Sequence, residues 1–280
     1  MTRDARNALL FASPALAAIA LVALVPIGWT LWESLHLHDL RMPWRGRPFV
    51  GLDHYVEIAH DGRFRGALAH TLFFTASAVS LEMVLGMALA LLLNQQMRGR
   101  AALRVVALLP WAIPTVVVAL VWRFIFETQT PAWFISPRAA WVPIVAADVW
   151  RMTPFVAILL LAGLQQIDVS LYEAARMDGA SGWRQFWEIT FPLLRQTLAV
   201  AVLFRALDAF RVFDLVFVMT GGGPGTATEP LSMYAFTSLL RNLRFGFGSA
   251  VSVVVFAAAF AGALLWVRLL SVTALAGRSE

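Results

Sequence analysis

The sequence predicts an all-α integral membrane protein with six transmembrane helices. Of its 280 residues, 60% are hydrophobic and 14% are charged, whereas soluble domains carry about 25% charged residues. Six segments each hold about 20 mostly apolar residues, the number that spans a bilayer at about 1.5 Å per residue. A purely soluble enzyme is therefore not expected. The six segments are residues 8–31, 71–93, 105–126, 142–164, 197–219 and 247–270.

Four of the six segments, the first three and the last, carry few charges. Residues 8–31 hold none and follow Arg3 and Arg6, as a signal peptide would. The apolar run exceeds the roughly 7–15-residue core of a signal peptide, which favours a retained helix. The second segment carries only Glu82, which we expect to form hydrogen bonds inside the helix bundle; pairing with an Arg of another helix is the alternative. The third and sixth segments each carry one Arg toward one end.

Charges concentrate in the fourth and fifth segments. The fourth holds Asp148 and Arg151. The fifth holds a row of four charges at a spacing of three residues. A charge at the bilayer centre costs roughly 2.5–3.5 kcal/mol on insertion scales, so this row should face a polar cavity or a partner helix. The row consists of Arg205, Asp208, Arg211 and Asp214.

Two absences exclude several kinds of chemistry. All 22 basic residues are Arg, and there is no Cys. Without Lys there is no Walker A phosphate loop and no Schiff base. Without Cys there is no disulfide, thiolate metal site or cysteine nucleophile. We find no HExxH motif and no nucleophile–base arrangement, so neither a metal site nor catalytic residues are expected. The five histidines, loosely clustered in and near the first outer loop, are His36, His38, His54, His60 and His70.

The loop between the fourth and fifth segments, residues 168–194, is too polar and too long for a simple turn. Ser170 and Glu173 have the spacing of a capping box at a helix start. Gly179 suits a left-handed cap at the helix end, and Ser181 can cap a second short helix. The loop is therefore predicted to be a helix–turn–helix elbow outside the bilayer core. It would either dock on another protein or rest on lipid headgroups.

Six crossings place both termini on the same side of the membrane. The short loop 95–104 has three Arg and no acidic residue, which favours the cytoplasmic side. We therefore expect both termini and the elbow to be cytoplasmic.

The elbow resembles the EAA signature of ABC-importer permeases. Glu173-Ala174-Ala175 is followed after three residues by Gly179, after nine more by Ile189, and one residue later by Phe191-Pro192. The usual last pair is Leu-Pro, so Phe191 departs from the pattern. In that family this segment is a coupling helix, seated in a cleft of a cytoplasmic ATPase. The resemblance assigns this coupling role to Glu173, Ala174, Ala175, Met177, Asp178, Gly179 and Ala180.

The resemblance covers nearly the whole chain and is to the carbohydrate-uptake branch. It implies the type I ABC importer permease fold, in which residues 1–66 form the N-terminal tail, first helix and first periplasmic loop. Residues 67–280 then form the permease core. The chain is similar to the first of two non-identical permeases in maltose, trehalose and glycerol-3-phosphate importers, and residues 203–214 look closest to the trehalose type. The other similar stretches are residues 49–55, 210–214, 220–225 and 245–250.

The resemblance also implies a sugar-binding site on the fourth and fifth helices. Ala209 and Val212 lack the polar side chains that maltose-type members can use, so the sugar or its pose should differ. Arg211 and Asp214 are expected to shape the upper cavity. A ladder of structural ion pairs in the fifth helix is the alternative. The resemblance also lands on Met152, beside Pro154. The eight candidate substrate-binding residues are Trp150, Arg151, Phe155, Arg205, Asp208, Ala209, Arg211 and Val212.

The expected function is the membrane-spanning half of an ATP-driven importer in the bacterial inner membrane. Its substrate would be a disaccharide such as trehalose or maltose, or else glycerol-3-phosphate or another small polar solute. The chain would bind no cofactor and no nucleic acid. Its partners would be a second permease, two ATPase subunits that hold ATP and Mg²⁺, and an extracytoplasmic sugar-binding protein.

Two alternatives belong to other classes. One is an intramembrane enzyme that uses Glu82, Asp208 or the histidines. The other is an ion-coupled carrier, for which inverted repeats with broken helices would be expected.

Overall fold

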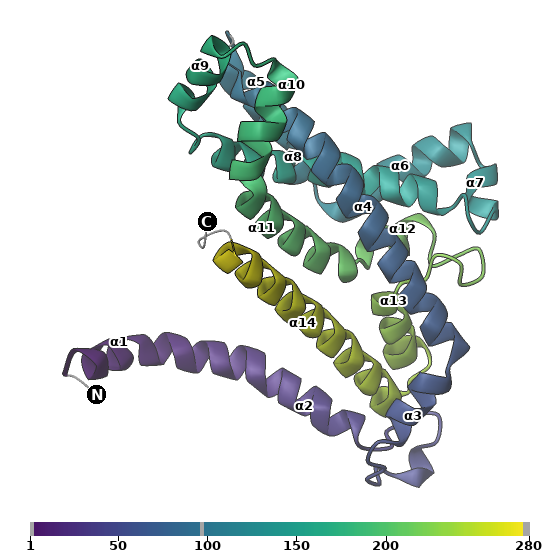
Figure 1. Ribbon diagram of the computed structural model, residues 1–280. Helices are drawn as coiled ribbons and strands as arrows, with labels where there is room; N and C mark the ends of the chain where they lie inside the picture. Colours follow the sequence, from purple (N-terminus) through teal and green to yellow (C-terminus); the bar gives the residue numbers. More distant parts are fainter. Residues whose placement is uncertain (1–2, 96–97, 277–280) are drawn as a thin grey trace. The chain divides into compact units, whose positions relative to one another are not determined.

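The computed structural model describes residues 3–95 and 98–276, which form helices joined by turns and loops (Figure 1). The chain packs as two units. The first comprises Met1–Phe64 with Tyr234–Ala258, and the second Arg65–Met233 with Ala259–Glu280. The predicted boundary between residues 66 and 67 falls inside a helix, and it stays a prediction.

Most helices belong to one unit, whereas three contribute to both. The shared helices are α4 (Gly62–Asn94), α13 (Leu231–Phe236) and α14 (Phe245–Ala276). The first unit also contains α1 (Arg3–Ile19), η1 (Ala20–Leu24), α2 (Val25–Ser34), η2 (Pro43–Arg45), α3 (Asp53–His60) and η4 (Thr237–Arg241). The second also contains α5 (Arg100–Ala112), α6 (Thr115–Gln129), α7 (Ala132–Ile135), α8 (Trp141–Leu164), α9 (Val169–Met177), α10 (Gly182–Gln185), η3 (Phe186–Thr190), α11 (Phe191–Phe210) and α12 (Asp214–Met219).

The six predicted membrane segments all have helical counterparts. Within residues 3–95 and 98–276, five helical runs are long and apolar enough to cross a bilayer, and the bent pair α5 and α6 makes a sixth if it counts as one span. The side on which the termini lie stays a prediction, and residues 1–2 and 277–280 lie outside the described residues. The five runs are Phe11–Ser34, Gly62–Asn94, Trp141–Leu164, Gly182–Phe210 and Phe245–Leu269.

The prediction of one continuous helix over residues 105–126 was wrong. Helix α5 ends at Ala112, and α6 leaves at an angle of 87°. Pro114 causes this break, because proline lacks an N–H and disfavours helical geometry at the preceding residue. Ile113 accordingly has the extended angles φ −77° and ψ 133°.

The predicted fifth segment, residues 197–219, is also interrupted. Helix α11 ends at Phe210, and a short linker precedes Asp214, the first residue of α12. The charged row therefore does not lie on one helix. On the side toward the elbow, α11 is extended: the helix is continuous from Gly182 to Phe210 through the π-helical turn η3. Pro192 lies in the first turn of α11, where it does not stop the helix.

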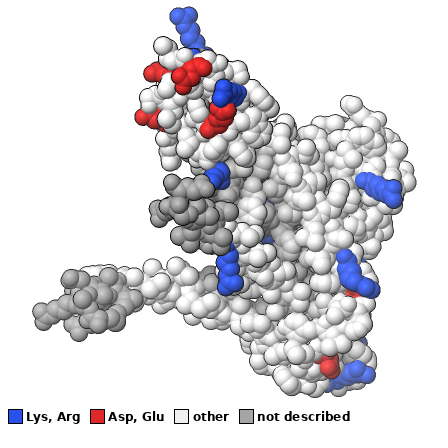
Figure 2. Space-filling model, viewed as in Figure 1, with Lys and Arg blue, Asp and Glu red and all other residues white. Residues whose placement is uncertain are grey.

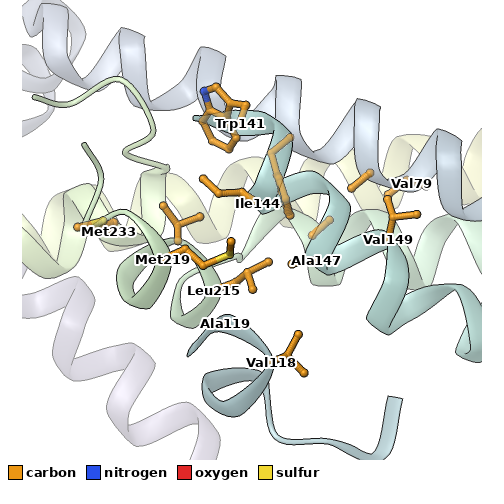
Figure 3. Packing of buried hydrophobic residues seen from close by; sticks show 14 residues of the cluster. Val79, Val118, Ala119, Trp141, Ile144, Ala147, Val149, Leu215, Met219 and Met233 are labelled. Atoms are coloured by element: carbon orange, nitrogen blue, oxygen red, sulfur yellow. The ribbon is translucent and has the colours of Figure 1, made fainter. Parts of the chain in front are cut away.

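Helix α8 is the centre of the second unit. Over the most apolar 18 residues of α8, 56% are buried, compared with 39% over the most apolar 18 residues of α4. In one cluster, Trp141 and Ile144 of α8 pack with Leu215 and Met219 of α12 (Figure 3). A second cluster joins α8 to α4 and α11. The helix that precedes the elbow is thus packed against the helix that follows it.

Two Arg–carboxylate pairs lie in the first unit. Arg41 donates two side-chain hydrogen bonds to Asp39, at 2.6 and 2.9 Å. These bonds outweigh the effect of burial and lower the pKa of Asp39. Arg244 donates to both carboxylate oxygens of Glu57 at 2.7 Å. The Arg244–Glu57 pair connects α3 with the residue before α14.

The α8–α11 contact depends on a glycine. A Cβ at Gly163 would lie 2.6 Å from Thr197 Oγ1 and 2.8 Å from Leu194 Cδ1. Small residues permit such close approach, and van der Waals packing drives helix association in bilayers.

We therefore expect Gly163→Ala to lower the stability of the protein by about 1–3 kcal/mol, the usual cost of overpacking. The measurement is thermal unfolding of the purified protein in detergent. Gly262→Ala in α14 is the matched control, because a Cβ there meets nothing within 4 Å. Equal unfolding midpoints for the two variants would contradict the close packing.

Candidate functional site

A polar cavity of about 130 Å³ lies in the second unit, among α8, α11 and α12. Its wall includes the linker after α11 and the first residue of α6, so both helix breaks described above border it. The breaks place irregular backbone beside a cavity, where it is tolerated in a membrane protein. The lining residues are Phe74, Thr115, Asp148, Arg151, Asp208, Ala209, Arg211, Val212, Phe213, Asp214 and Leu215.

Behind this wall, Arg205 joins three helices. Its Nε and Nη2 donate to the two carboxylate oxygens of Glu82 on α4, at 2.5 and 2.8 Å. Nη2 also donates to Asp148 on α8 at 2.9 Å. Nη1 donates to Asp208, one turn further along α11, at 2.5 Å. The network therefore ties α4, α8 and α11 together through a single guanidinium.

The network is buried at one end and open at the other. The side chains of Arg205 and Glu82 are 1% and 0% exposed, and that of Asp148 is 6% exposed. The Asp208 side chain is 50% exposed. A buried charge is unfavourable unless it is paired, and removing one partner of a buried pair typically costs about 3–5 kcal/mol. The buried end is thus a structural requirement, whereas the open end faces the cavity.

For Glu82 the favoured expectation, hydrogen bonds within the bundle, was wrong. The alternative holds, because its carboxylate pairs with Arg205 of another helix. Asp148 is a further member of the network that our list of site residues omitted. The sequence showed both acidic residues within apolar segments but not which Arg they would pair with.

The structure brings together five of the eight residues predicted to bind substrate. Three others lie elsewhere: Arg205 is behind the wall, Trp150 packs on Trp122, and Phe155 stacks on Trp111. Substrate contact by any of the eight stays a prediction. The five in the cavity wall are Arg151, Asp208, Ala209, Arg211 and Val212.

Arg151 is only partly satisfied. Its Nη2 lies 3.9 Å from Asp148 Oδ1, longer than a hydrogen bond. Its Nε is buried and has no hydrogen-bond partner. A buried donor without an acceptor is costly. The Arg151 side chain lines the cavity and is 16% exposed, so its guanidinium, though not the buried Nε, can reach a polar ligand.

The elbow has the helix–turn–helix form that was predicted, with one change in its capping. Asp168, and not Ser170, caps α9: its carboxylate accepts from the Ser170 amide at 2.9 Å. That bond lowers the pKa of Asp168. Gly179 has φ +75°, the left-handed conformation expected at a helix end. Ser181 caps α10 by accepting from the amide of Arg184.

Charged residues gather over the α9–α10 end of the second unit, and the neighbouring helices have a largely uncharged surface (Figure 2). Apolar side chains are also exposed there. Met177 is 89% exposed and Trp183 is 72% exposed. Residues of this kind and exposure are typical of protein interfaces. The elbow thus presents a mixed polar and apolar surface.

The histidines bond to neighbouring groups of the chain. His38 pairs with Glu33. The other four each contact a backbone carbonyl, as His70 does with Glu229 at 3.1 Å. Across residues 3–95 and 98–276, no three His, Asp or Glu side chains converge as a metal site would require.

The Arg205 network yields a stability prediction. Glu82→Leu should destabilise the protein by about 3–5 kcal/mol, because the buried guanidinium loses a bidentate partner. Thermal unfolding in detergent measures this change. Glu127→Leu is the control: it breaks an Arg–Glu pair on α6 whose side chains are 45% and 47% exposed, and such pairs contribute about 0–1 kcal/mol. Similar losses in both variants would argue against the network's importance.

The chain resembles known permeases over almost its full length. Residues 82–279 match the family described as the binding-protein-dependent transport system inner membrane component. The trehalose/maltose transport system permease protein MalF of Thermococcus litoralis is 40% identical, covering 91% of this chain and 90% of that protein. The trehalose transport system permease protein SugA of Mycobacterium tuberculosis is 36% identical, with coverage of 98% and 92%.

A solved structure has the same fold. The crystal structure of a bacterial ABC transporter involved in the import of the acidic polysaccharide alginate matches with a TM-score of 0.77 at 21% identity. The match covers 94% of this chain and 95% of that one. This match confirms the predicted type I importer fold. The family model and the relatives confirm that the chain is a transport subunit. The chain belongs to the inner membrane components of binding-protein-dependent transport systems, the permeases of ABC importers.

Proposed function

We propose that this chain is the permease subunit of an ATP-driven sugar importer and forms one wall of the translocation pathway. The observation that carries the proposal is the polar cavity beside the Arg205 network, within helices long and apolar enough to span a bilayer. The relatives at 36–40% identity are named for trehalose or maltose transport. A disaccharide of this kind is the proposed substrate.

The charges of the wall favour a neutral, hydroxylated solute. Two guanidiniums, of Arg151 and Arg211, face three carboxylates, of Asp148, Asp208 and Asp214, which gives a formal charge of −1. Hydroxyl groups can donate to carboxylates and accept from guanidiniums. An anion such as glycerol-3-phosphate would meet net repulsion. This balance is the reason to prefer a sugar over the phosphorylated alternative.

The size of the cavity supports a pathway built from two subunits. Its volume of about 130 Å³ is well below the roughly 300–1,000 Å³ of pockets that enclose small molecules. One chain therefore supplies part of a binding site, and a second, non-identical permease supplies the rest. Trp150, at 42% exposed, and Phe155 are proposed to stack on the sugar in the assembled pathway.

The elbow is proposed to dock in a cytoplasmic ATPase. Its helices are capped at Asp168 and Ser181, and it joins α8 directly to the run that contains α11. ATP and Mg²⁺ would bind on two ATPase subunits, and an extracytoplasmic binding protein would deliver the sugar. Both termini would then be cytoplasmic. The residues proposed to contact the ATPase are Glu173, Ala174, Ala175, Met177, Asp178, Gly179 and Ala180.

Uptake by the reconstituted complex tests the proposed function. The permease with its second permease, ATPases and binding protein should import trehalose or maltose into liposomes only when ATP is hydrolysed. A catalytically inactive ATPase subunit is the control and should abolish uptake. Import driven by a proton gradient alone would contradict the proposal and favour a secondary carrier.

Substitution of Gly179 tests the docking role. Gly179→Asp places a charge and a strained left-handed residue at the elbow, so a complex that reaches the membrane should hydrolyse ATP with little sugar uptake. Gly99→Asp is a matched control, because Gly99 has φ +82° and its Cβ would also meet nothing within 4 Å. The backbone strain, about 1–2 kcal/mol, is then similar in both. Normal uptake by Gly179→Asp would remove the elbow from coupling.

A further inference from the structure

We propose that Arg205 and Glu82 are positioning residues that set solute selectivity without touching the solute. They hold the carboxylate of Asp208 against the cavity, and Asp208 makes the contact. This inference rests on the proposed function of a sugar permease, and it reassigns Arg205 from ligand to support.

The hydrogen bonds of Arg205 leave it almost no capacity for a ligand. A guanidinium has five N–H donors. Four of them are used: two on Glu82, one on Asp148 and one on Asp208. With its side chain 1% exposed, Arg205 could reach a solute only by abandoning buried carboxylates, which is unfavourable.

Asp208 occupies the opposite position. Its Oδ2 accepts from Arg205, its side chain is 50% exposed, and it lines the cavity. One oxygen is therefore anchored and the other remains available as an acceptor. The same wall carries the partly exposed guanidinium of Arg151. Sugar hydroxyls both donate and accept, so they can donate to Asp208 and accept from Arg151.

Anchoring matters because selectivity depends on where the acceptor lies. A site built to hydrogen-bond a particular hydroxyl rejects solutes that lack it, since its polar groups are then left unpaired. If Glu82 loses its charge, Arg205 is drawn toward the remaining carboxylates, Asp148 and Asp208. The Asp208 carboxylate should then turn from the cavity toward α4. A residue on α4 would thus change the ranking of sugars.

The test compares Glu82→Gln, Asp208→Asn and the double variant in the reconstituted complex. Uptake rates are measured for a panel containing trehalose, maltose and sucrose, after confirming equal amounts of assembled complex. Both single variants should shift the trehalose-to-maltose rate ratio in the same direction, by about tenfold if one hydrogen bond of about 1.4 kcal/mol is lost. The double variant should resemble Asp208→Asn, because both changes act through one carboxylate.

Glu127→Gln is the matched control. It removes the charge of another Arg–Glu pair in the same unit, outside the cavity, and should leave the ratio unchanged. A purely structural role for Glu82 would lower uptake of every sugar by the same factor. That result, or additive shifts in the double variant, would overturn the proposal.

A second measurement needs no sugar, and it tests the positioning role separately from the proposed function. A cryo-EM structure of the Glu82→Gln complex in nanodiscs should show the Asp208 carboxylate displaced from the cavity. If wild-type complex imports no sugar of the panel, the proposed function fails, and this structure still decides the positioning role. An unmoved Asp208 would overturn it.

Discussion

The arrangement of this permease depends on the burial of one guanidinium in a helix bundle. Arg205 is 1% exposed, and its charge is tolerable there only because carboxylates from α4, α8 and α11 surround it. This requirement brings three helices together in a defined register, since a planar guanidinium donates its hydrogen bonds to carboxylates in fixed directions. Apolar packing then fills the space around the network. The polar contact specifies the arrangement, and the apolar contacts stabilise it.

The two helix breaks have a common consequence at the cavity. Pro114 ends α5 early and makes Thr115 the first residue of α6, while the linker after Phe210 separates α11 from α12. Both breaks border the cavity beside the network. Continuous helices would present only side chains there, whereas the breaks add irregular backbone and make room for Arg211 and Asp214. The interruptions of the helices therefore help to form the polar cavity.

Hydropathy predicted the membrane segments well because a span requires a length and composition that a single sequence displays. The elbow was predictable for a similar reason: its caps are local, and Gly179 adopts the conformation that glycine favours. The network could not be predicted, because pairing between Glu82 and Arg205 depends on how helices 123 residues apart in sequence pack. Pro114 was visible, but hydropathy averages over a window and does not register a single proline. The proposed contacts between sugar and wall would involve a second chain, whose sequence this one does not contain.

The position of the network suggests how movement of the elbow could reach the cavity. The elbow is continuous with the run containing α11 and is joined through a short turn to α8, and these helices meet at Gly163 near the elbow and at the Arg205–Asp148 pair deeper in the bundle. From Leu164 back to Asp148 is about 24 Å along α8. Two helices joined at both points should move together, because separating them would expose the paired charges. A displacement of the elbow would then shift the cavity wall relative to α5 and α6, whose break lies at the same cavity. The coupling is mechanical in this view, and its stiffness comes from the cost of breaking a buried ion pair.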